Sequence, residues 1–327
     1  MNTPPDRLGV LVLGGGPDHE REVSIESSGA VAEALRADGR FSVRHELVGR
    51  LDRDALEALL AGGETGVVFP VLHGPWGEGG GVQRLLEGAG VAFVGSGSRA
   101  SGAAMDKIRT KQVAAQLGVR VLDSAVLDPL VHDAPPFDLP VIVKPVCQGS
   151  SIGMRACRTE DEWASAVDDA RAGSMPMMVE PMLGGIRELA VGLVSLAGSE
   201  RLEGVPLVEI TPAKDALRDG LYDYEAKYRR DDTRYTPDPD LPGGLAERLV
   251  AWTKSVAHAL RVRHLCRADY LLDDEGRAVF LELNTMPGFT GHSLLPLACR
   301  HAGTALPALC AGLVHRAWLD ARTPAGV

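Results

Sequence analysis

The chain has 327 residues, of which 45% are hydrophobic and 24% charged, a balance typical of a globular protein with two or three domains. Its 44 acidic residues outnumber 34 basic ones, and the formal net charge of -10 argues against non-specific binding to nucleic acid or to an anionic membrane. The five cysteines include no C-x-x-C pair, and no apolar segment reaches the length of a membrane span. We therefore expect a cytoplasmic protein with reduced thiols and with no nucleic-acid or membrane partner.

The first hundred residues predict a small parallel α/β domain. Residues 8–16, LGVLVLGGG, form an apolar strand that ends in glycines, and residues 20–39 predict a helix closed by Gly39. Residues 66–74 and 91–98 predict two further strands, separated by a Gly-rich loop and a short helix. Strand, helix and strand in this order predict ligand-binding groups at the carboxyl edge of the sheet.

The middle of the chain carries basic residues beside a Gly/Ser loop. Residues 101–119 predict one helix with Lys107 in its first turns, and VIVKP predicts a strand that bears Lys144, followed by the loop GSSIG. Small residues let backbone N–H groups approach phosphates, and the lysines add positive charge. The spacing is not that of a P-loop, and LGGG lacks the G-x-G-x-x-G pattern of a dinucleotide site. The alternative is an ordinary turn beside surface lysines.

The later elements include one long irregular segment. Residues 158–173 predict a helix, residues 177–182 a strand, and RELAVGLVSL begins a longer strand. Residues 211–243 are rich in charge and proline and hold four of the five tyrosines, which favours a lid or binding loop over a plain surface loop. AERLVAWTKSVAHALRV predicts a helix, and residues 294–321 are mostly helical by pattern.

CRADYLLDDEGRAVFLELN predicts a hairpin with its two-residue turn at 275–276. This register places Asp269 opposite Glu282 and Arg267 opposite Asn284. Alternate residues of a strand face one side, so all four share a face. Asp, Glu and Asn oxygens without His or Cys suit magnesium or manganese, with substrate phosphates and water completing the shell. The alternative is a structural Arg–Asp pair beside a solvent-facing glutamate.

Together these pieces resemble the ATP-grasp enzymes and, within them, the D-alanine–D-alanine ligase family. The resemblance extends over nearly the whole chain, through LGGGPDHEREVS, LHGPWGEGGGVQ, VGSGSRASGAAMDK, LPVIVKP, GSSIGM, YDYEAKY, RADYLL, LELNTMPG and GHSLLP, in that order. It implies an α+β (ATP-grasp) fold: a substrate-binding α/β domain at 1–104, a central lobe at 105–188 and a catalytic domain at 189–327 with the lid loop 211–243. The two lobes would enclose the ATP cleft, and the protein would be a homodimer.

The resemblance also implies a nucleotide site with ATP and two magnesium or manganese ions. The residues implied to bind the nucleotide are Lys107, Lys144 and Lys227 at the phosphates, Ser151 in the Gly/Ser loop, Glu180 at the adenine hinge and Glu188 at the ribose. Asp269, Glu282 and Asn284 would hold the metal ions.

Two further groups would bind the D-alanine substrates and perform the chemistry. Glu20 would hold the ammonium of the first substrate, in a hydrogen-bonded set with Ser150 and Tyr228. His73 would assist proton transfer or orientation, with a non-catalytic loop histidine as the alternative.

The remaining implied residues belong to the second substrate and to the developing oxyanion. Ser293 and the backbone of Leu294 would take the carboxylate of the second substrate, while Arg267 and the N–H of Gly288 would donate to the oxyanion. The implied reaction forms an acyl phosphate and then D-alanyl-D-alanine for peptidoglycan precursors. YDYEAKY is the lid sequence of members that form a peptide rather than an ester.

Three departures from the family pattern leave an alternative open. Gly79 stands where Asp is usual, Pro181 follows Glu180 and removes a backbone donor, and GGIREL carries an insertion before Glu188. A diverged ligase for other D- or L-amino acids in specialised metabolism is therefore the second hypothesis. A nucleotide-binding protein without catalysis would be expected to lack the metal ligands or Arg267, and a dehydrogenase would need the glycine fingerprint.

Overall fold

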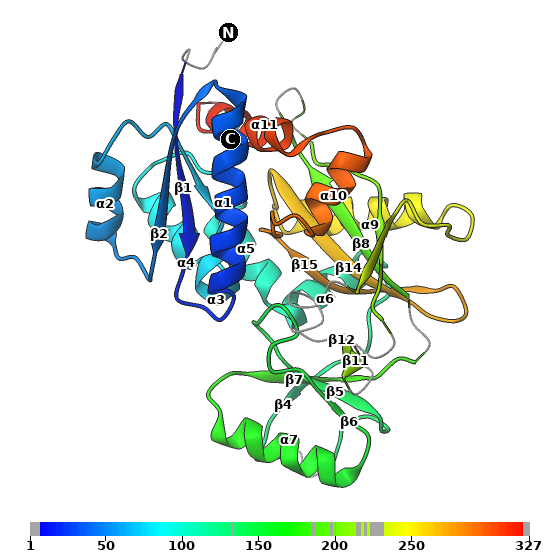
Figure 1. Cartoon of the computed structure of the whole chain (residues 1–327). Helices are drawn as coiled ribbons and strands as arrows, with labels where there is room; N and C mark the ends of the chain where they lie inside the picture. The colour runs from blue at the N-terminus through cyan, green and yellow to red at the C-terminus, as the bar shows by residue number, and fades with distance from the viewer. Residues whose placement is uncertain are drawn as a thin grey trace.

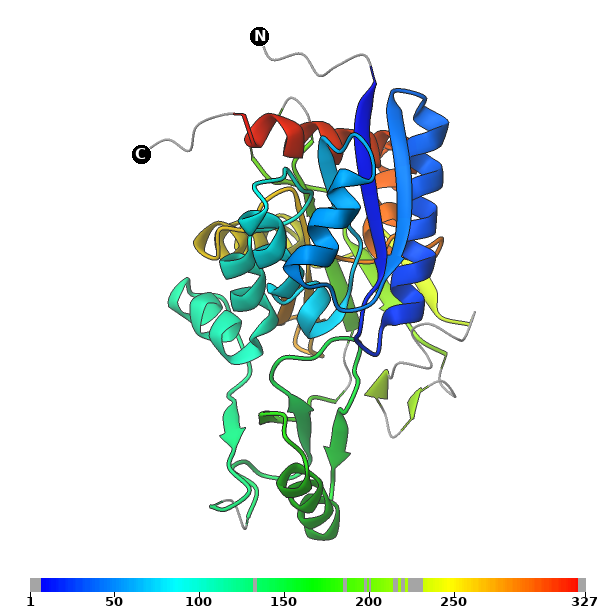
Figure 2. The ribbon, with the colours of Figure 1, turned by 90° about the vertical axis from the view of Figure 1, so that its left-hand side faces the viewer.

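The structure is a computed structural model that describes residues 7–131, 134–184, 187–196, 199, 201–213, 217–218, 221–222 and 232–322. Figure 1 shows two larger bodies side by side and a smaller one at the end far from helix α11 (Leu306–Asp320). Figure 2, turned by 90°, shows the same separation of the small body from α11.

The N-terminal body is built on a three-stranded parallel sheet in the order β2-β1-β3. Its strands are β1 (Leu8–Gly15), β2 (Phe41–Val48) and β3 (Val67–Pro70). Its helices are α1 (Arg21–Asp38), α2 (Arg53–Ala61), α3 (Gly74–Gly77) and α4 (Gly81–Gly88). Gly39 closes α1 with φ 79°, as expected.

The third strand of this sheet is not the one that the sequence pattern predicts. Residues 91–98 contribute only an isolated bridge between Val68 and Phe93, and β2 takes the place beside β1. Only the two ends of β2, Phe41 and Val48, are buried. An edge strand of this kind has no apolar run, which is why its sequence does not predict a strand.

The single helix predicted at 101–119 is wrong, because the structure has two helices there. Helix α5 (Ser98–Met105) ends at Asp106, whose backbone is extended, and α6 (Lys107–Gln116) begins directly after it. The Asp106 carboxylate accepts the N–H of Arg109 at 3.0 Å and caps α6. Lys107 is therefore the first residue of a new helix.

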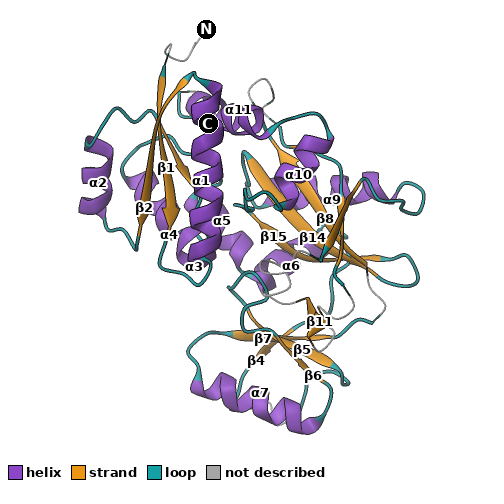
Figure 3. Ribbon diagram, viewed as in Figure 1, coloured by secondary structure: helices purple, strands orange, loops and turns teal. Residues whose placement is uncertain are grey.

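The small body is a four-stranded antiparallel sheet in the order β4-β7-β5-β6. Its strands are β4 (Ala125–Leu127), β5 (Val141–Pro145), β6 (Arg155–Cys157) and β7 (Met177–Pro181). Helix α7 (Glu160–Ala172) covers one face of this sheet (Figure 3). Trp163 of α7 lies in a hydrophobic core that belongs to this body.

The third body is a six-stranded antiparallel sheet with the main order β13-β10-β8-β14-β15 and β9 paired to β8. Its strands are β8 (Arg187–Val194), β9 (Glu203–Gly204), β10 (Val208–Thr211), β13 (Arg234–Pro237), β14 (Leu265–Leu272) and β15 (Ala278–Asn284). A separate hairpin is formed by β11 (Leu217–Arg218) and β12 (Leu221–Tyr222). Helix α9 (Leu245–Ala259) packs on this body together with residues of α5 and α6.

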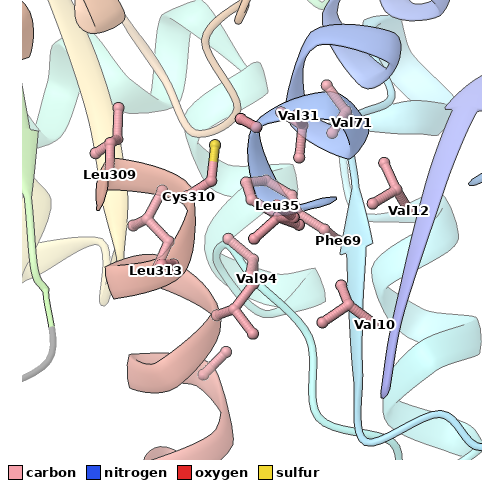
Figure 4. Close-up of a cluster of buried hydrophobic side chains, with 14 of the residues drawn as sticks. Val10, Val12, Val31, Leu35, Phe69, Val71, Val94, Leu309, Cys310 and Leu313 are labelled. Carbon is pink, nitrogen blue, oxygen red and sulfur yellow. The ribbon is translucent and has the colours of Figure 1, made fainter. Parts of the chain in front are cut away.

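The C-terminal helices join the third body to the first. Helix α10 (Leu294–His301) leads into α11, and Leu309, Cys310 and Leu313 of α11 pack in one core with α1 and the parallel sheet (Figure 4). In the part of the chain that the structure describes, no single helix is long and apolar enough to cross a membrane, and α10 with α11 passes that test only as a pair bent by 105°.

Candidate active site

A cavity of about 370 Å³ lies between the small sheet and the six-stranded sheet. Its walls come from β5, β7 and the Gly/Ser loop on one side and from β8, β10, β14 and β15 on the other. The predicted site residues that line it are Lys107, Lys144, Ser151, Glu180, Glu188, Asp269 and Glu282. Seven residues from distant parts of the sequence thus meet at one cavity.

The hairpin of β14 and β15 sets the acidic wall of the cavity. Arg267 pairs with Asn284 and Asp269 with Glu282, which confirms the predicted register at these positions. The predicted turn is wrong, because Leu272 pairs with Ala278 and the turn occupies residues 274–276. A β-bulge beside Asp269 absorbs the one-residue difference.

This bulge also explains how two consecutive residues reach the same cavity. Leu281 is the residue of β15 that has no partner in the register, and both Leu281 and Glu282 line the cavity. In a regular strand they would face opposite sides. The bulge therefore gives the wall an apolar side chain directly beside a carboxylate.

The predicted metal ligands supply oxygen donors on paired positions of this hairpin. Asp269 accepts both hydrogen bonds of the Arg267 fork, each at 2.8 Å, and Glu282 pairs with Lys107 at 3.0 Å. The Asn284 side-chain oxygen accepts the N–H of Met286 at 2.8 Å. The predicted ligand set consists of two carboxylates and one amide. Within the described ranges, no group of three His, Cys, Asp or Glu side chains is arranged to bind a metal. Oxygen-only donors of this kind fit magnesium that keeps phosphate and water ligands.

The basic wall begins at helix α6. Lys107, its first residue, donates to the carbonyl of Gln148 at 2.5 Å in addition to its pairing with Glu282. On β5, Lys144 pairs with Glu180 of β7 at 2.6 Å. Lys107 is buried and Lys144 is partly buried, and both line the cavity, as expected for groups that meet an anionic ligand.

Lys111 is a site residue that the sequence pattern did not single out. It lies one helical turn after Lys107, and its ammonium contacts the second oxygen of Glu180. Burial, with Lys144 nearby, lowers the pKa of Lys111 to about 8. Burial opposes the ionisation of Glu180, but the charges of both lysines outweigh it and hold the pKa of Glu180 below its ordinary value. The only sequence signal was the four-residue spacing of two lysines on one helix.

A second group lies where the N-terminal body meets the Gly/Ser loop. The Ser150 hydroxyl donates to the buried carboxylate of Glu20, which directly precedes α1. Ser150 and Ser151 both have positive φ, 54° and 58°, in the loop that presents them. Tyr228 and Lys227 lie outside the described residues, so their predicted places in the site stay predictions.

His73 is buried close to this group. Burial lowers the pKa of His73 to about 4, in spite of its hydrogen bond with the Met286 backbone. Its Nε2 has no hydrogen-bond partner among the residues that the structure describes. Beside it, burial and the nearby charge of Glu20 raise the pKa of Glu78 well above its ordinary value. The imidazole is therefore neutral around pH 7.

The loop before α10 completes the site, and one serine from α1 supports it. The Ser27 hydroxyl accepts the N–H of Phe289 at 3.0 Å, and the Ser293 hydroxyl accepts the N–H of Thr290 at 2.9 Å. A Cβ atom at Gly288 would lie 2.7 Å from the Ser293 hydroxyl, so a larger residue there would displace this hydroxyl from its hydrogen bond with Thr290. Ser293 precedes Leu294, the first residue of α10. The role of Ser27 was missed, because only the folded chain brings it to position 289.

Two departures from the family pattern have a local structural reason. Met182 donates to the carbonyl of Pro140, the residue before β5, at 2.9 Å, so the missing N–H of Pro181 points away from β5. The pairing of β4 with β7 ends at Val179, so no ladder bond is lost at Pro181. At Gly79, a Cβ atom would lie 2.3 Å from the Pro75 carbonyl oxygen.

Comparisons with known proteins agree with this geometry. Residues 130–315 match the family model for the D-ala D-ala ligase C-terminus. The chain is 37% identical over 321 residues to the D-alanine–D-alanine ligase of Bordetella parapertussis, and the match covers 97% of each chain. It is 36% identical over 301 residues to the D-alanine–D-alanine ligase of Pseudomonas entomophila, and that match covers 90% of this chain and 88% of the relative.

Solved structures show the same fold at lower identity. The D-alanine-D-alanine ligase from Coxiella burnetii matches with a TM-score of 0.80 at 22% identity, covering 97% of this chain and 96% of that one. The VanG D-Ala:D-Ser ligase from Enterococcus faecalis matches with a TM-score of 0.77 at 23% identity, covering 95% of this chain and 99% of that one. With its ATP-grasp fold and this degree of identity, the chain belongs to the D-alanine–D-alanine ligase family.

Proposed function

We propose that this protein joins two D-alanine molecules into D-alanyl-D-alanine with the conversion of ATP to ADP and phosphate, for peptidoglycan precursor synthesis. The observation that carries the proposal is the cavity between the two sheets, where lysines face two carboxylates in a chain of this family. We also infer a cytoplasmic homodimer. The family relationship supports both inferences.

ATP would occupy the cavity with its phosphates at the basic wall. Lys107 and Lys144 would neutralise the phosphate oxygens, with Lys227 of the lid segment and the Ser151 loop adding contacts. Glu180 would lie at the adenine and Glu188 at the ribose. Their places on the cavity wall support this assignment.

Asp269, Glu282 and Asn284 would hold two magnesium or manganese ions. When bound, such ions neutralise phosphate charge that develops during the transfer. The oxygen-only donor set on the β14–β15 hairpin supports magnesium over a softer metal.

In the first step, a carboxylate oxygen of the first D-alanine attacks the γ-phosphorus of ATP. A new P–O bond forms, the bond to the β-phosphate oxygen breaks, and ADP leaves an acyl phosphate behind. Glu20 would hold the ammonium of this D-alanine while Ser150, and by our proposal Tyr228, keep Glu20 in place. Catalysis of this step consists mostly of positioning and charge neutralisation.

In the second step, the amine of the second D-alanine attacks the carbonyl carbon of the acyl phosphate. Arg267 and the N–H of Gly288 would donate to the oxyanion. Collapse of the intermediate breaks the C–O bond to phosphate, and the attacking nitrogen loses a proton, which leaves the amide and free phosphate. Ser293 and the backbone of Leu294 would bind the carboxylate of the second substrate. The hydrogen bond from the Thr290 N–H and the helix start at Leu294 support that placement.

His73 would orient a substrate rather than protonate it. A histidine with a pKa of about 4 is a neutral imidazole at neutral pH and cannot act as a general acid, but its unpartnered Nε2 can accept a hydrogen bond. The position of His73 beside the Glu20 group supports a role at the first substrate.

The test is phosphate release with ATP and magnesium across single and paired amino acids, with products identified by mass. Release that depends on D-alanine, with D-alanyl-D-alanine formed, is the expected result. Glu282→Gln, which keeps the shape but removes a proposed metal charge, should abolish release. Phosphate release only with another amino-acid pair would show that D-alanine is not the substrate. A protein that binds nucleotide but releases no phosphate with any pair would refute the proposed ligase activity.

A further inference from the structure

Helix α6 contributes two lysines that pair with carboxylates of two different sheets. Lys107 pairs with Glu282 on β15 at 3.0 Å, whereas Lys111 contacts Glu180 on β7 of the small body. Glu180 receives a second lysine, Lys144, at 2.6 Å on its other oxygen. A single buried carboxylate thus has two cationic partners.

The two lysines at Glu180 differ in their access to the cavity. The side chain of Lys144 is 12% exposed and lines the cavity, whereas that of Lys111 is 2% exposed and lies behind the wall. Lys144 can therefore turn towards a ligand in the cavity, and Lys111 cannot reach one. Glu180 is itself 2% exposed, so its charge depends on partners within the protein.

We propose that Lys111 is a positioning residue for the nucleotide: it stays with Glu180 and thereby allows Lys144 to exchange Glu180 for a phosphate group. This inference rests on the proposed binding of ATP in the cavity. Lys111 acts through Glu180 and makes no contact with the nucleotide itself.

The physical reason is the free-energy cost of an unpaired buried charge. If Lys111 were absent, Lys144 would be the only cation on Glu180, and its movement to a phosphate would leave a carboxylate buried without a partner. Nucleotide binding would then have to offset that cost. With both lysines present, one carboxylate holds one lysine and the other lysine is available to the ligand.

A purely structural ion pair predicts a different result. In that case the loss of Lys111 would lower stability, and removal of the Glu180 charge as well would not restore nucleotide affinity. The proposal predicts restoration, because a neutral amide at position 180 no longer needs a cation and releases Lys144 to the phosphates. The double variant therefore separates the two explanations.

The experiment measures the Kd of the full-length protein for a non-hydrolysable ATP analogue with magnesium, by isothermal titration without amino acids. Lys111→Met is expected to raise Kd by about tenfold or more, and Lys111→Arg to stay within about threefold of the wild type. Glu180 is itself assigned to the adenine, so Lys111→Met combined with Glu180→Gln is compared with Glu180→Gln alone, and their Kd values are expected to lie within about threefold of each other. Arg109→Met, on the exposed side of α6, is the matched control and should leave Kd unchanged.

Two results would overturn the inference. One is a Lys111→Met protein that binds the analogue as the wild type does, and the other is a double variant that binds about tenfold or more weakly than Glu180→Gln alone. If Lys111→Met does not fold, the double variant and Lys111→Arg carry the same comparison. A wild type that binds the analogue without making dipeptide would refute the proposed substrates alone, whereas a wild type that does not bind it would overturn both proposals.

Discussion

Replacement of Ser27 by alanine removes one buried hydroxyl that joins the N-terminal body to the loop before α10. Ser27 lies on α1 with no exposed surface, and its hydroxyl accepts the N–H of Phe289, 262 residues later in the chain, at 3.0 Å. Alanine fills nearly the same space but leaves that N–H buried without an acceptor. A buried polar group left unsatisfied costs about 1–3 kcal/mol, so we expect Ser27→Ala to lower the free energy of unfolding by that amount.

The loss of this hydrogen bond should also lower the activity, because Phe289 directly follows the proposed oxyanion donor Gly288. We expect kcat for dipeptide formation to fall, while nucleotide affinity in the cavity stays close to that of the wild type. Urea unfolding and steady-state kinetics measure the two effects. Ser255→Ala is the control: its hydroxyl donates to Ala251 at 3.0 Å on an exposed helix face, and its loss should stay within about 0.5 kcal/mol. If Ser27→Ala and Ser255→Ala have the same free energy of unfolding, the Ser27 hydrogen bond does not contribute the about 1–3 kcal/mol expected of it.

Three further changes test other parts of the site. Arg267→Lys keeps a positive charge but loses the bidentate fork, and we expect kcat at saturating substrates to fall by about 10²–10³ if Arg267 donates to the oxyanion; an unchanged kcat would exclude that role. Gly79→Ala places a Cβ atom 2.3 Å from the Pro75 carbonyl oxygen and should lower the free energy of unfolding in urea by about 1–3 kcal/mol, whereas Gly88→Ala, which meets nothing within 4 Å, should not. His73 has an ordinary pKa of 6.5 when unfolded and one of about 4 when folded, so the unfolded chain binds more protons between these values and stability falls as the pH drops through them. We expect the loss of unfolding free energy between pH 7 and pH 4, measured with urea, to be smaller in His73→Asn than in the wild type by on the order of 3 kcal/mol. An equal loss in the two proteins would contradict the buried, neutral imidazole.

The face of the acidic wall could be predicted from spacing, although the turn could not. Strand alternation fixes which residues share a side, so Asp269 and Glu282 were paired correctly. The turn at 274–276 and the bulge at Leu281 are opposite one-residue shifts that cancel before the site. Such a bulge depends on how the sheet twists and packs, and the sequence of the hairpin alone does not reveal it.

The parts that could not be predicted depend on contacts between distant segments. Lys111 has an ordinary helical position, and its importance comes from Glu180, which reaches it only when the small sheet folds over α6. Asp106 sits inside a pattern that is helical by composition, but its carboxylate caps the following helix instead. The roles of Tyr228 and Lys227 stay predictions.

The cores show how the three bodies are held around the cavity. The N-terminal body and the third body share one apolar core through α11, and α6 shares a core with the six-stranded sheet, whereas the small body has a core of its own. The small body reaches the other two through polar contacts at the site, among them Ser150 with Glu20 and Glu180 with Lys111.

These polar contacts involve the same side chains that we assign to the ligands. A nucleotide in the cavity would therefore exchange some protein–protein ion pairs for protein–phosphate ones, instead of adding its contacts to an unchanged set. The strength of nucleotide binding should then depend on how well the protein compensates the charges left behind. Lys111 is the residue placed to do this for Glu180, since it pairs with the carboxylate from outside the cavity and α6 anchors it in the core of the larger sheet.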